Sequence, residues 1–299
     1  MLAGIEEALS GRREVEMGVA QALLSNAIDY AGLFPPAGLD LRTTVRNYEE
    51  YRAGADAWAL GKLILPAKVF GEFLAMAPTF AEAWPISFLL DDDFGREVDA
   101  VEGRGFVLNV VECKPANVNR IAEVRCCLPE AELYVEVPAG GDLDEWLAAI
   151  ADAKACAKIR MGGVTVGAIP KTSVAANFLC ACARRGVGLK ATAGLHHGIR
   201  AEHPLTYEPQ SERAVMHGFV NFFVAAAIVY VGGSVAEAEA VLVDDSPENF
   251  RADEEGLRWG ARSFSVEQIR AAREKFAMSF GSCSFVEPLE DMRTMGWIE

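Results

Sequence analysis

All four histidines of this chain fall in one short stretch, at His196, His197, His203 and His217. The stretch follows a predicted strand, residues 187–192, in which Lys190 stands among small and apolar residues. Histidine is the side chain that most readily transfers protons or binds a metal near neutral pH. A desolvated lysine can form an imine with a carbonyl compound. The segment that begins at Lys190 therefore predicts the active site of an enzyme.

Polar and apolar side chains alternate along three predicted strands, residues 133–137, 157–161 and 187–192. Successive side chains of a strand point to opposite faces, and in a barrel the outer, apolar face packs under helices. The other face then points toward the barrel axis, and it carries Tyr134, Glu136, Lys158, Arg160, Lys190 and Thr192. The sequence therefore predicts that charges from three neighbouring strands converge on one interior.

The predicted interior holds three cations, Lys158, Arg160 and Lys190, but only one carboxylate, Glu136. A buried charge without a partner is costly. An anionic substrate, a phosphate or a carboxylate, would supply the missing negative charge. In the alternative interpretation, the aspartates at positions 91–93 neutralise the surplus in a purely structural network.

Crowding by other cations lowers the pKa of a partly desolvated lysine, which can then act as an uncharged amine. Small residues around Lys190 leave room for a substrate, so Lys190 is the predicted imine-forming or electrophilic residue. Arginine stays charged and is suited to holding an oxyanion. The remaining predicted roles are anion binding by Arg160, Lys158 and Thr192, and proton transfer by Glu136 and by His196 or His197.

Two of these predicted strands resemble a known family. Residues 159–170, followed by residues 187–194, are similar to paired strands of deoxyribose-phosphate aldolases, over about forty residues of the chain. The resemblance implies a (β/α)₈ class I aldolase with lysines on two adjacent strands, one of which forms the Schiff base. Arg160 lies near the position of that Schiff-base lysine, and Lys190 resembles the accessory lysine. The resemblance thus implies that imine chemistry has moved to Lys190 or Lys158, or has been lost.

Two other function classes remain open. Two of the histidines between His196 and His217, with Glu136, Glu202 or an aspartate, would bind a divalent metal in a metal-dependent lyase, isomerase or hydrolase. No HExxH or HxH spacing supports this metal site, and no other cofactor is expected. The third class is a non-catalytic barrel that binds a small anion.

A run of small residues near the C-terminus contains Ser282 and Ser284 and precedes a predicted helix start at Pro288. Backbone N–H groups and hydroxyls at such a place can bind phosphate, and barrels often do so at their last loops. Capping of the helix by Ser284 is the alternative interpretation. Cys283 lies between the two serines, but no histidine is near it in sequence, so it is not the expected nucleophile.

Short apolar runs alternate with amphipathic stretches from about residue 58 onward, which is typical of parallel strands covered by helices. The repeat is typical of a (β/α)₈ barrel, and no GxGxxG follows the first strand as a dinucleotide-binding sheet would require. Predicted helices include residues 67–80, 117–127, 142–155 and 170–185. The predicted strands are residues 60–65, 86–90, 105–111, 133–137, 157–161 and 187–192.

The sequence predicts one barrel domain over residues 1–299, with two departures from the repeat. Residues 1–57 are predicted to be an N-terminal extension, in which the proline-rich loop 28–38 forms a lid or a plug. Residues 233–299 are less regular and must complete the barrel, with the last two strands expected near 250–260 and 278–286. Within this part, helices are predicted over 235–243 and 266–276, and a hairpin is predicted within 250–260.

The formal charge of −15 and pI near 4.8 argue against nucleic acid and anionic membranes as partners. The apolar segment 215–231 contains His217 and Asn221, so we expect a helix buried in the fold or at a contact between copies in a homo-oligomer.

Residues 1–18 carry no apolar leader, and seven cysteines without a CxxC motif indicate reduced thiols. A cytoplasmic protein that binds a small anionic metabolite is the resulting expectation.

Overall fold

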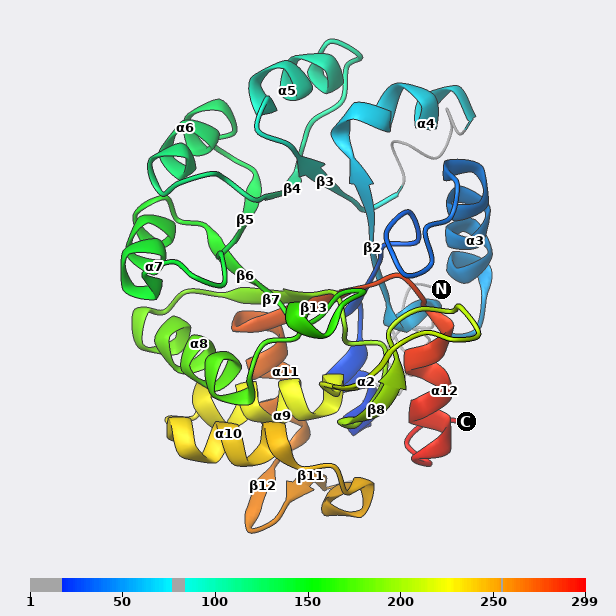
Figure 1. The fold of residues 1–299 in the computed structure, drawn as a ribbon, viewed down its shortest axis with the longest axis vertical. Helices are drawn as coiled ribbons and strands as arrows, with labels where there is room; N and C mark the ends of the chain where they lie inside the picture. Colours follow the sequence, from blue (N-terminus) through cyan, green and yellow to red (C-terminus); the bar gives the residue numbers. More distant parts are fainter. Residues whose placement is uncertain (1–17, 77–83, 254) are drawn as a thin grey trace, which may run out of the picture.

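The computed structural model describes residues 18–76, 84–253 and 255–299. Eight parallel strands form a closed barrel with helices on its outside, a (β/α)₈ barrel as predicted (Figure 1). In chain order the strands are β1 (Ile28–Tyr30), β2 (Leu60–Pro66), β3 (Ile86–Leu90), β4 (Val110–Cys113), β5 (Glu132–Glu136), β6 (Cys156–Arg160), β7 (Leu189–Thr192) and β13 (Ala277–Ser282). Strand β13 closes the barrel between β7 and β1.

Helices follow most of the strands and cover the barrel wall. They are α3 (Leu41–Ala53), α4 (Phe70–Met76), α5 (Phe94–Glu102), α6 (Asn119–Cys127), α7 (Leu143–Asp152), α8 (Thr172–Arg185), α9 (Phe219–Tyr230), α10 (Val235–Val243), α11 (Val266–Lys275) and α12 (Val286–Thr294), and α2 (Val19–Leu24) precedes β1. Four short 3₁₀ turns occur at Ala57–Ala59, Ala67–Val69, Val166–Ala168 and Pro247–Asn249. The predicted start of α7 is confirmed, because the Asp142 side chain accepts hydrogen bonds from Asp144 N and Glu145 N.

Two predicted elements in the first half are displaced in the structure. The strand expected over 105–111 begins only at Val110, because Gly105 has a left-handed φ of 83° and Val107 is exposed. The helix expected over 67–80 is described only as far as Met76, and residues 77–80 lie outside the described residues. The other strands predicted between residues 60 and 192 are confirmed to within two residues.

The N-terminal region differs most from its prediction. Residues Ile28–Tyr30 are the first barrel strand, paired with β2 and β13, so this part of the predicted extension belongs to the barrel. All three residues are buried, and a three-residue strand shows no alternation by which a sequence reveals it. The prolines and glycines interrupt regular structure only after Tyr30. Residues 1–17 of the predicted extension lie outside the described residues.

The last barrel strands were also misplaced in part. Residues 250–260 supply no barrel strand. They contribute to a separate antiparallel sheet of β10 (Phe250–Asp253), β11 (Gly256–Trp259) and β12 (Arg262–Phe264). Strand β13, at Ala277–Ser282, provides the expected final strand close to its predicted place. The hairpin predicted within residues 250–260 is confirmed by the antiparallel pairing of β10 with β11, and this local pairing replaces the long-range parallel pairing of a barrel strand.

Helix α9 is buried inside the chain, as one of the two interpretations of segment 215–231 required. Every residue from Phe219 to Val229 is buried. The apolar surface of these residues is thus used within the fold. Among the described residues, one helical segment, Val166–Arg185, is long and apolar enough to cross a membrane by length and composition, and it contains the barrel helix α8. All seven cysteines are free thiols.

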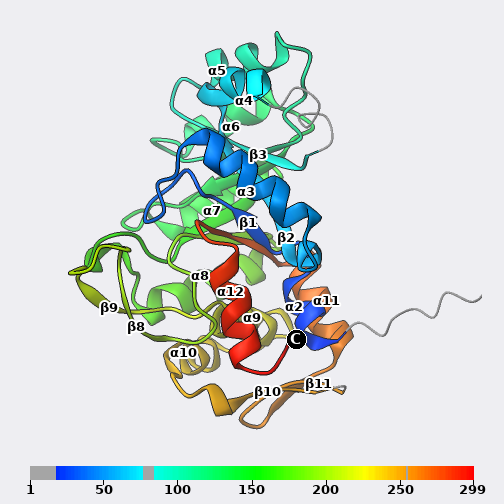
Figure 2. The same cartoon turned by 90° about the vertical axis from the view of Figure 1, so that its right-hand side faces the viewer.

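The predicted histidine segment lies between β7 and α9 and contains a hairpin of β8 (Ala201–Pro204) and β9 (Arg213–Met216). Figure 2 shows this hairpin on the same side of the barrel as the loop that follows β1. The buried Asn221 of α9 anchors the segment. Its Oδ1 accepts a hydrogen bond from Arg200 N, and its Nδ2 donates to the carbonyls of Val241 and Asp244.

Replacement of Asn221 by alanine is expected to lower the free energy of unfolding by about 3 kcal/mol, because it leaves three backbone groups without a partner. Urea unfolding followed by circular dichroism measures this loss. Asn177→Ala is the matched control, since the Asn177 side chain donates one hydrogen bond to Ser173 O within an exposed helix turn. The control is expected to change stability by no more than about 0.5 kcal/mol. Equal effects of the two substitutions would contradict the anchoring role.

Candidate active site

The predicted convergence of charged side chains inside the barrel is confirmed. Glu136, Lys158 and Lys190 are all buried and face the interior from β5, β6 and β7. Register pairs Lys158 with both Glu136 and Lys190 across neighbouring strands. Arg160 stands at the end of β6, and 47% of its side chain is exposed. The strands thus place one cation at the rim and two in the interior.

The surroundings of Lys190 do not favour the nucleophile role that the sequence predicts for it. Its Nζ lies 2.5 Å from Asp29 Oδ2 and 2.7 Å from Glu112 Oε1, and 1% of the residue is exposed. Burial disfavours the charged ammonium group, but the two carboxylates outweigh burial and raise the pKa of Lys190 above its ordinary value. The prediction of a lowered pKa was wrong because two acidic partners were missing from it. Lys190 is a charged structural residue below the site.

Glu112 is the carboxylate shared by the two buried lysines. Its Oε2 lies 2.8 Å from Lys158 Nζ and its Oε1 2.7 Å from Lys190 Nζ, and Ser87 Oγ also donates to Oε1. Burial favours the neutral acid, but the two ammonium groups hold the pKa of Glu112 well below its usual range. Asp29 on β1 is the second missed carboxylate, and it accepts hydrogen bonds from Ser279 Oγ and Lys62 N.

The expected shortage of negative charge is therefore wrong for the deep interior. Asp29, Glu112 and Glu136 balance the three predicted cations. The acidic run at residues 91–93 does not supply these partners, because Asp91 pairs with Lys68 at the surface and Asp93 with Arg96. The sequence missed Asp29 because its strand was taken for a loop. It missed Glu112 because the strand that contains this residue was predicted over 105–111 and so ended one residue before it.

Lys158 occupies a different position from Lys190, at the floor of a cavity. Its Nζ lies between Glu112 Oε2 at 2.8 Å and Glu136 Oε2 at 3.2 Å. Glu136 also contacts Arg160 Nε at 3.2 Å and Lys114 Nζ at 3.7 Å. Burial favours the neutral form of Glu136, but its three cationic neighbours lower the pKa of the carboxyl group. One carboxylate is therefore surrounded by three positive charges at the top of the cluster.

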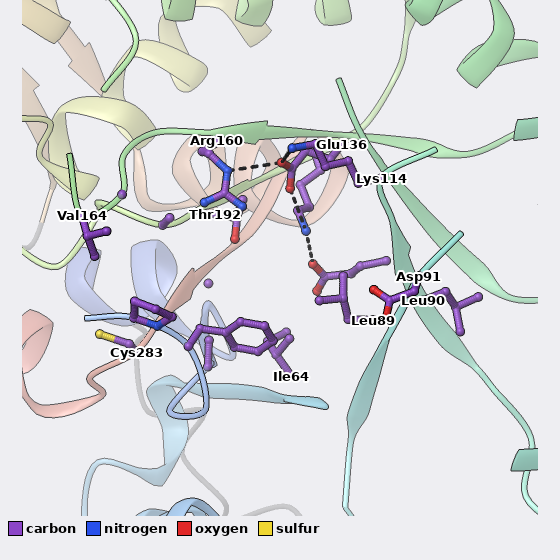
Figure 3. A pocket seen from close by; sticks show the side chains of 18 of the residues that line it. Ile64, Leu89, Leu90, Asp91, Lys114, Glu136, Arg160, Val164, Thr192 and Cys283 are labelled. Carbon is purple, nitrogen blue, oxygen red and sulfur yellow. Dashed lines mark hydrogen bonds and ion pairs between the residues drawn. The ribbon is translucent and has the colours of Figure 1, made fainter. Parts of the chain in front are cut away.

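A cavity of about 470 Å³ opens at the carboxyl ends of the strands, above this cluster (Figure 3). This end of a (β/α)₈ barrel is where such enzymes hold their active sites. The charged and polar lining residues are Asp91, Asp92, Glu112, Lys114, Glu136, Lys158, Arg160, Thr192, His196 and Cys283. The larger apolar lining residues are Phe34, Pro35, Ile64, Leu89, Leu90 and Val164. Phe34 and Pro35 belong to the predicted lid loop, which bounds this mouth cavity.

His196 lines the mouth cavity and is almost fully buried. Its Nδ1 lies 3.2 Å from Ser282 Oγ, 3.8 Å from Cys283 Sγ and 3.7 Å from Glu287 Oε2. Burial lowers the pKa of His196 to about 4, with smaller contributions from the neighbouring histidines. The imidazole is therefore neutral near pH 7 and can accept or donate a proton at the cavity wall.

The other histidines are directed elsewhere. His197 points away from His196, as expected for neighbours, with Nδ1 3.2 Å from Asp291 Oδ2 and its ring stacked on that of His203. Of the two histidines predicted as alternatives for proton transfer, His196 is thus the one that lines the mouth cavity. His217 contacts the Pro170 carbonyl. Within the described parts of the chain, no group of three or more His, Cys, Asp or Glu side chains is placed to hold a metal ion. The metal-dependent class remains a prediction from the sequence.

The two predicted phosphate-binding serines do not line the mouth cavity. Ser282 is buried and contacts His196, and Ser284 Oγ accepts a hydrogen bond from Glu287 N in the first turn of α12. The capping interpretation thus describes Ser284 better than phosphate binding does. Thr192, by contrast, lies in the cavity wall beside Arg160, as predicted.

Cys283 is a cavity residue that the sequence argument set aside. Its Sγ lies 3.8 Å from His196 Nδ1, although the two residues are 87 positions apart in the chain. Pairing of β7 with β13 brings their following loops together, which spacing along the sequence does not reveal. Burial raises the pKa of the Cys283 thiol, so the group is a protonated thiol at neutral pH. In Figure 3, Cys283 stands across the cavity from Arg160.

Comparison with known proteins does not assign a family. No family model matches the chain. No curated protein matches it either. Among solved structures, the lysine decarboxylase from Selenomonas ruminantium is similar over 93% of this chain, with 12% sequence identity and a TM-score of 0.41. The chain spans 58% of the length of that protein. A likeness of this degree indicates neither a reaction nor a family, so the resemblance to aldolases stays a prediction.

Replacing Lys190 with methionine is expected to lower the free energy of unfolding by about 3–5 kcal/mol at pH 7, because it leaves Asp29 and Glu112 short of a buried partner. Chemical denaturation at a series of pH values measures the loss. Because the lysines lower the folded-state pKa of Glu112, the stability that this carboxylate provides is present above about pH 4.5 and lost below it. The difference between the two proteins should therefore shrink as the pH falls below that value.

Lys68→Met provides the control for this substitution. It removes the same charge from the exposed pair that Lys68 makes with Asp91 at 3.0 Å. Exposed pairs contribute at most about 1 kcal/mol. A loss for Lys190→Met as small as the control, or one that does not change between pH 7 and pH 3, would contradict the buried charge network.

The His196 imidazole is expected to stay neutral from pH 8 down to pH 5.5 and to gain its proton near pH 4, because burial disfavours the charged ring. Nitrogen NMR of histidine-labelled protein follows the titration, and His196→Gln identifies the signal that belongs to this residue. A titration midpoint above pH 6 would show that His196 is more open to solvent than its position in the cavity wall implies.

Proposed function

We propose that this chain is a lyase of the aldolase type that forms an imine with the carbonyl group of a small anionic substrate through Lys158. The observation that supports the proposal is the position of this amine at the floor of the mouth cavity, with a carboxylate on either side. Lys190 lies below the floor and is enclosed by Asp29 and Glu112. The lysine available to a substrate is therefore the one on β6.

The anionic group of the substrate binds to Arg160 and Lys114 at the cavity wall. Arg160 uses Nε to contact Glu136, and among the described residues its terminal nitrogens remain for a ligand. The side chain of Lys114 is 64% exposed beside the same carboxylate. With Lys158, these residues place three cations around Glu136. A phosphate or carboxylate group offsets the surplus charge, and the planar guanidinium group fits either oxyanion.

Binding of the anionic substrate makes it easier for Lys158 to lose its proton. Three cations keep Glu136 a weak base, but an anion on Arg160 and Lys114 offsets two of them and makes this carboxylate more basic. Glu136 then takes a proton from the Lys158 ammonium group, 3.2 Å away. The free amine adds to the carbonyl carbon, the carbonyl oxygen takes one proton from the added amine and one from protonated Glu136, and it leaves as water, so that a protonated imine forms.

The later steps of the reaction use His196, on the opposite side of the cavity. The bond between the carbon next to the imine carbon and the departing fragment breaks, and its electron pair moves through an enamine to the imine nitrogen, which is the electron sink. The neutral His196 ring accepts the proton released by the departing fragment and returns it to the remaining carbon. Water then hydrolyses the imine and frees Lys158. Cys283 and Ser282 hold the His196 ring through its Nδ1 contacts.

Borohydride reduction in the presence of 2-oxo acids and sugar phosphates is expected to attach the substrate to Lys158, because reduction converts the imine into a stable amine. Peptide mass spectrometry locates the label. Lys158→Arg keeps the charge between Glu112 and Glu136 but cannot form an imine, so it is expected to abolish labelling. Lys190 should remain unlabelled in the original protein, because its amine does not reach the mouth cavity.

Label on Lys190 in place of Lys158 would overturn this assignment. Absence of any label across the substrate panel would remove imine chemistry. If small anions still bound and Arg160→Leu abolished that binding, the non-catalytic anion-binding barrel would become the better description of the chain.

A further inference from the structure

A second cavity, of about 240 Å³, adjoins the mouth cavity on the other side of Arg160. The two cavities share three lining residues, Lys114, Glu136 and Arg160. Most of the remaining lining of the second cavity is apolar, and we call it the annex. Its larger apolar residues are Val137, Pro138, Ile159, Pro170, Val174 and Phe178.

The alternation of β6 explains why the two cavities meet at this point. Lys158 points into the barrel, and the next residue, Ile159, points outward to the helix layer, where it lines the annex beside Phe178 of α8. Arg160 ends the strand and borders both cavities. Arg160, together with Lys114 and Glu136, thus separates the mouth cavity from a mostly apolar one.

We infer that the ligand is a small organic anion with a short apolar chain, whose charged group binds Arg160 and Lys114 and whose chain fills the annex. The inference rests on the proposed function for the site of the anion, and it adds the class of substrate. An anionic group held by the shared cations lies between the cavities, and the carbonyl carbon that is bonded both to this group and to the chain can face Lys158 while the chain enters the annex. Each methylene buried there is expected to tighten binding about fourfold.

A phosphate at the far end of the chain is the strongest competing ligand. The annex borders the start of α8, whose N-cap residue Lys171 makes no side-chain cap hydrogen bond, and helix starts attract anions. Against this, Pro170 has no N–H group, and Val174 and Phe178 present only carbon to the cavity. The lining therefore favours an uncharged chain.

Calorimetric titration with straight-chain carboxylates from acetate to hexanoate tests the inference without requiring a carbonyl group. The Kd should fall about fourfold for each added methylene until the annex is full. Val174→Trp fills the annex and is expected to bring the ratio of the acetate Kd to the hexanoate Kd close to one. Val166→Trp is the matched control, because Val166 is equally exposed, at 46% against 47%, and lies outside the annex. This control should keep the ratio of the original protein.

Circular dichroism of both tryptophan variants verifies that they fold. Equal affinity for all chain lengths would overturn the inference, and so would tighter binding of 3-phosphonopropanoate than of pentanoate. Labelling of Lys158 without any dependence on chain length would keep the proposed function and reject the apolar chain. Dependence on chain length that Val174→Trp removes, without labelling of Lys158, would keep the inferred ligand class and reject the imine.

Discussion

The carboxylate of Glu112, held between two lysine ammonium groups inside a closed sheet, is the interaction on which the rest of this structure depends. Each of these charges alone would be costly to bury. Together with Asp29 and Glu136, they form a chain of alternating charges that crosses from β1 to β6. This chain joins strands that are far apart in the sequence, and it ends at the mouth cavity, where a substrate can take part in it.

The position of each lysine along this chain of charges determines whether the mouth cavity can reach it. Lys190 has carboxylates as neighbours and no access to the cavity, so burial and pairing keep it charged. Lys158 has the same neighbour in Glu112 but opens to the cavity at its other side. Arg160 is half exposed at the rim. Three cations therefore surround Glu136 at the mouth, where Asp91 and Asp92 also line the cavity, and the deep interior is balanced.

Much of this arrangement was predictable, and the failures have physical reasons. Alternation along 157–161 and 187–192 was enough to direct Lys158 and Lys190 inward, because a pleated strand leaves no other choice. It was not enough to find Asp29, whose strand is three buried residues long and shows no period. Without Asp29, and without Glu112 on the strand that was placed too early, the predicted interior lacked negative charge and Lys190 was predicted to be reactive. Two strand errors thus changed both the charge balance and the predicted nucleophile.

The sequence by itself determined the repeating units and the direction of the charged side chains. It also showed that lysine and histidine side chains gather at the end of β7. These features follow from local periodicity and composition. Only the tertiary structure decided which charges meet. Closure of the barrel places β13 between β7 and β1, and so brings Asp29 to Lys190 and Cys283 to His196. A pKa depends on neighbours within a few ångströms, and those neighbours are selected by strand order, which local patterns do not encode.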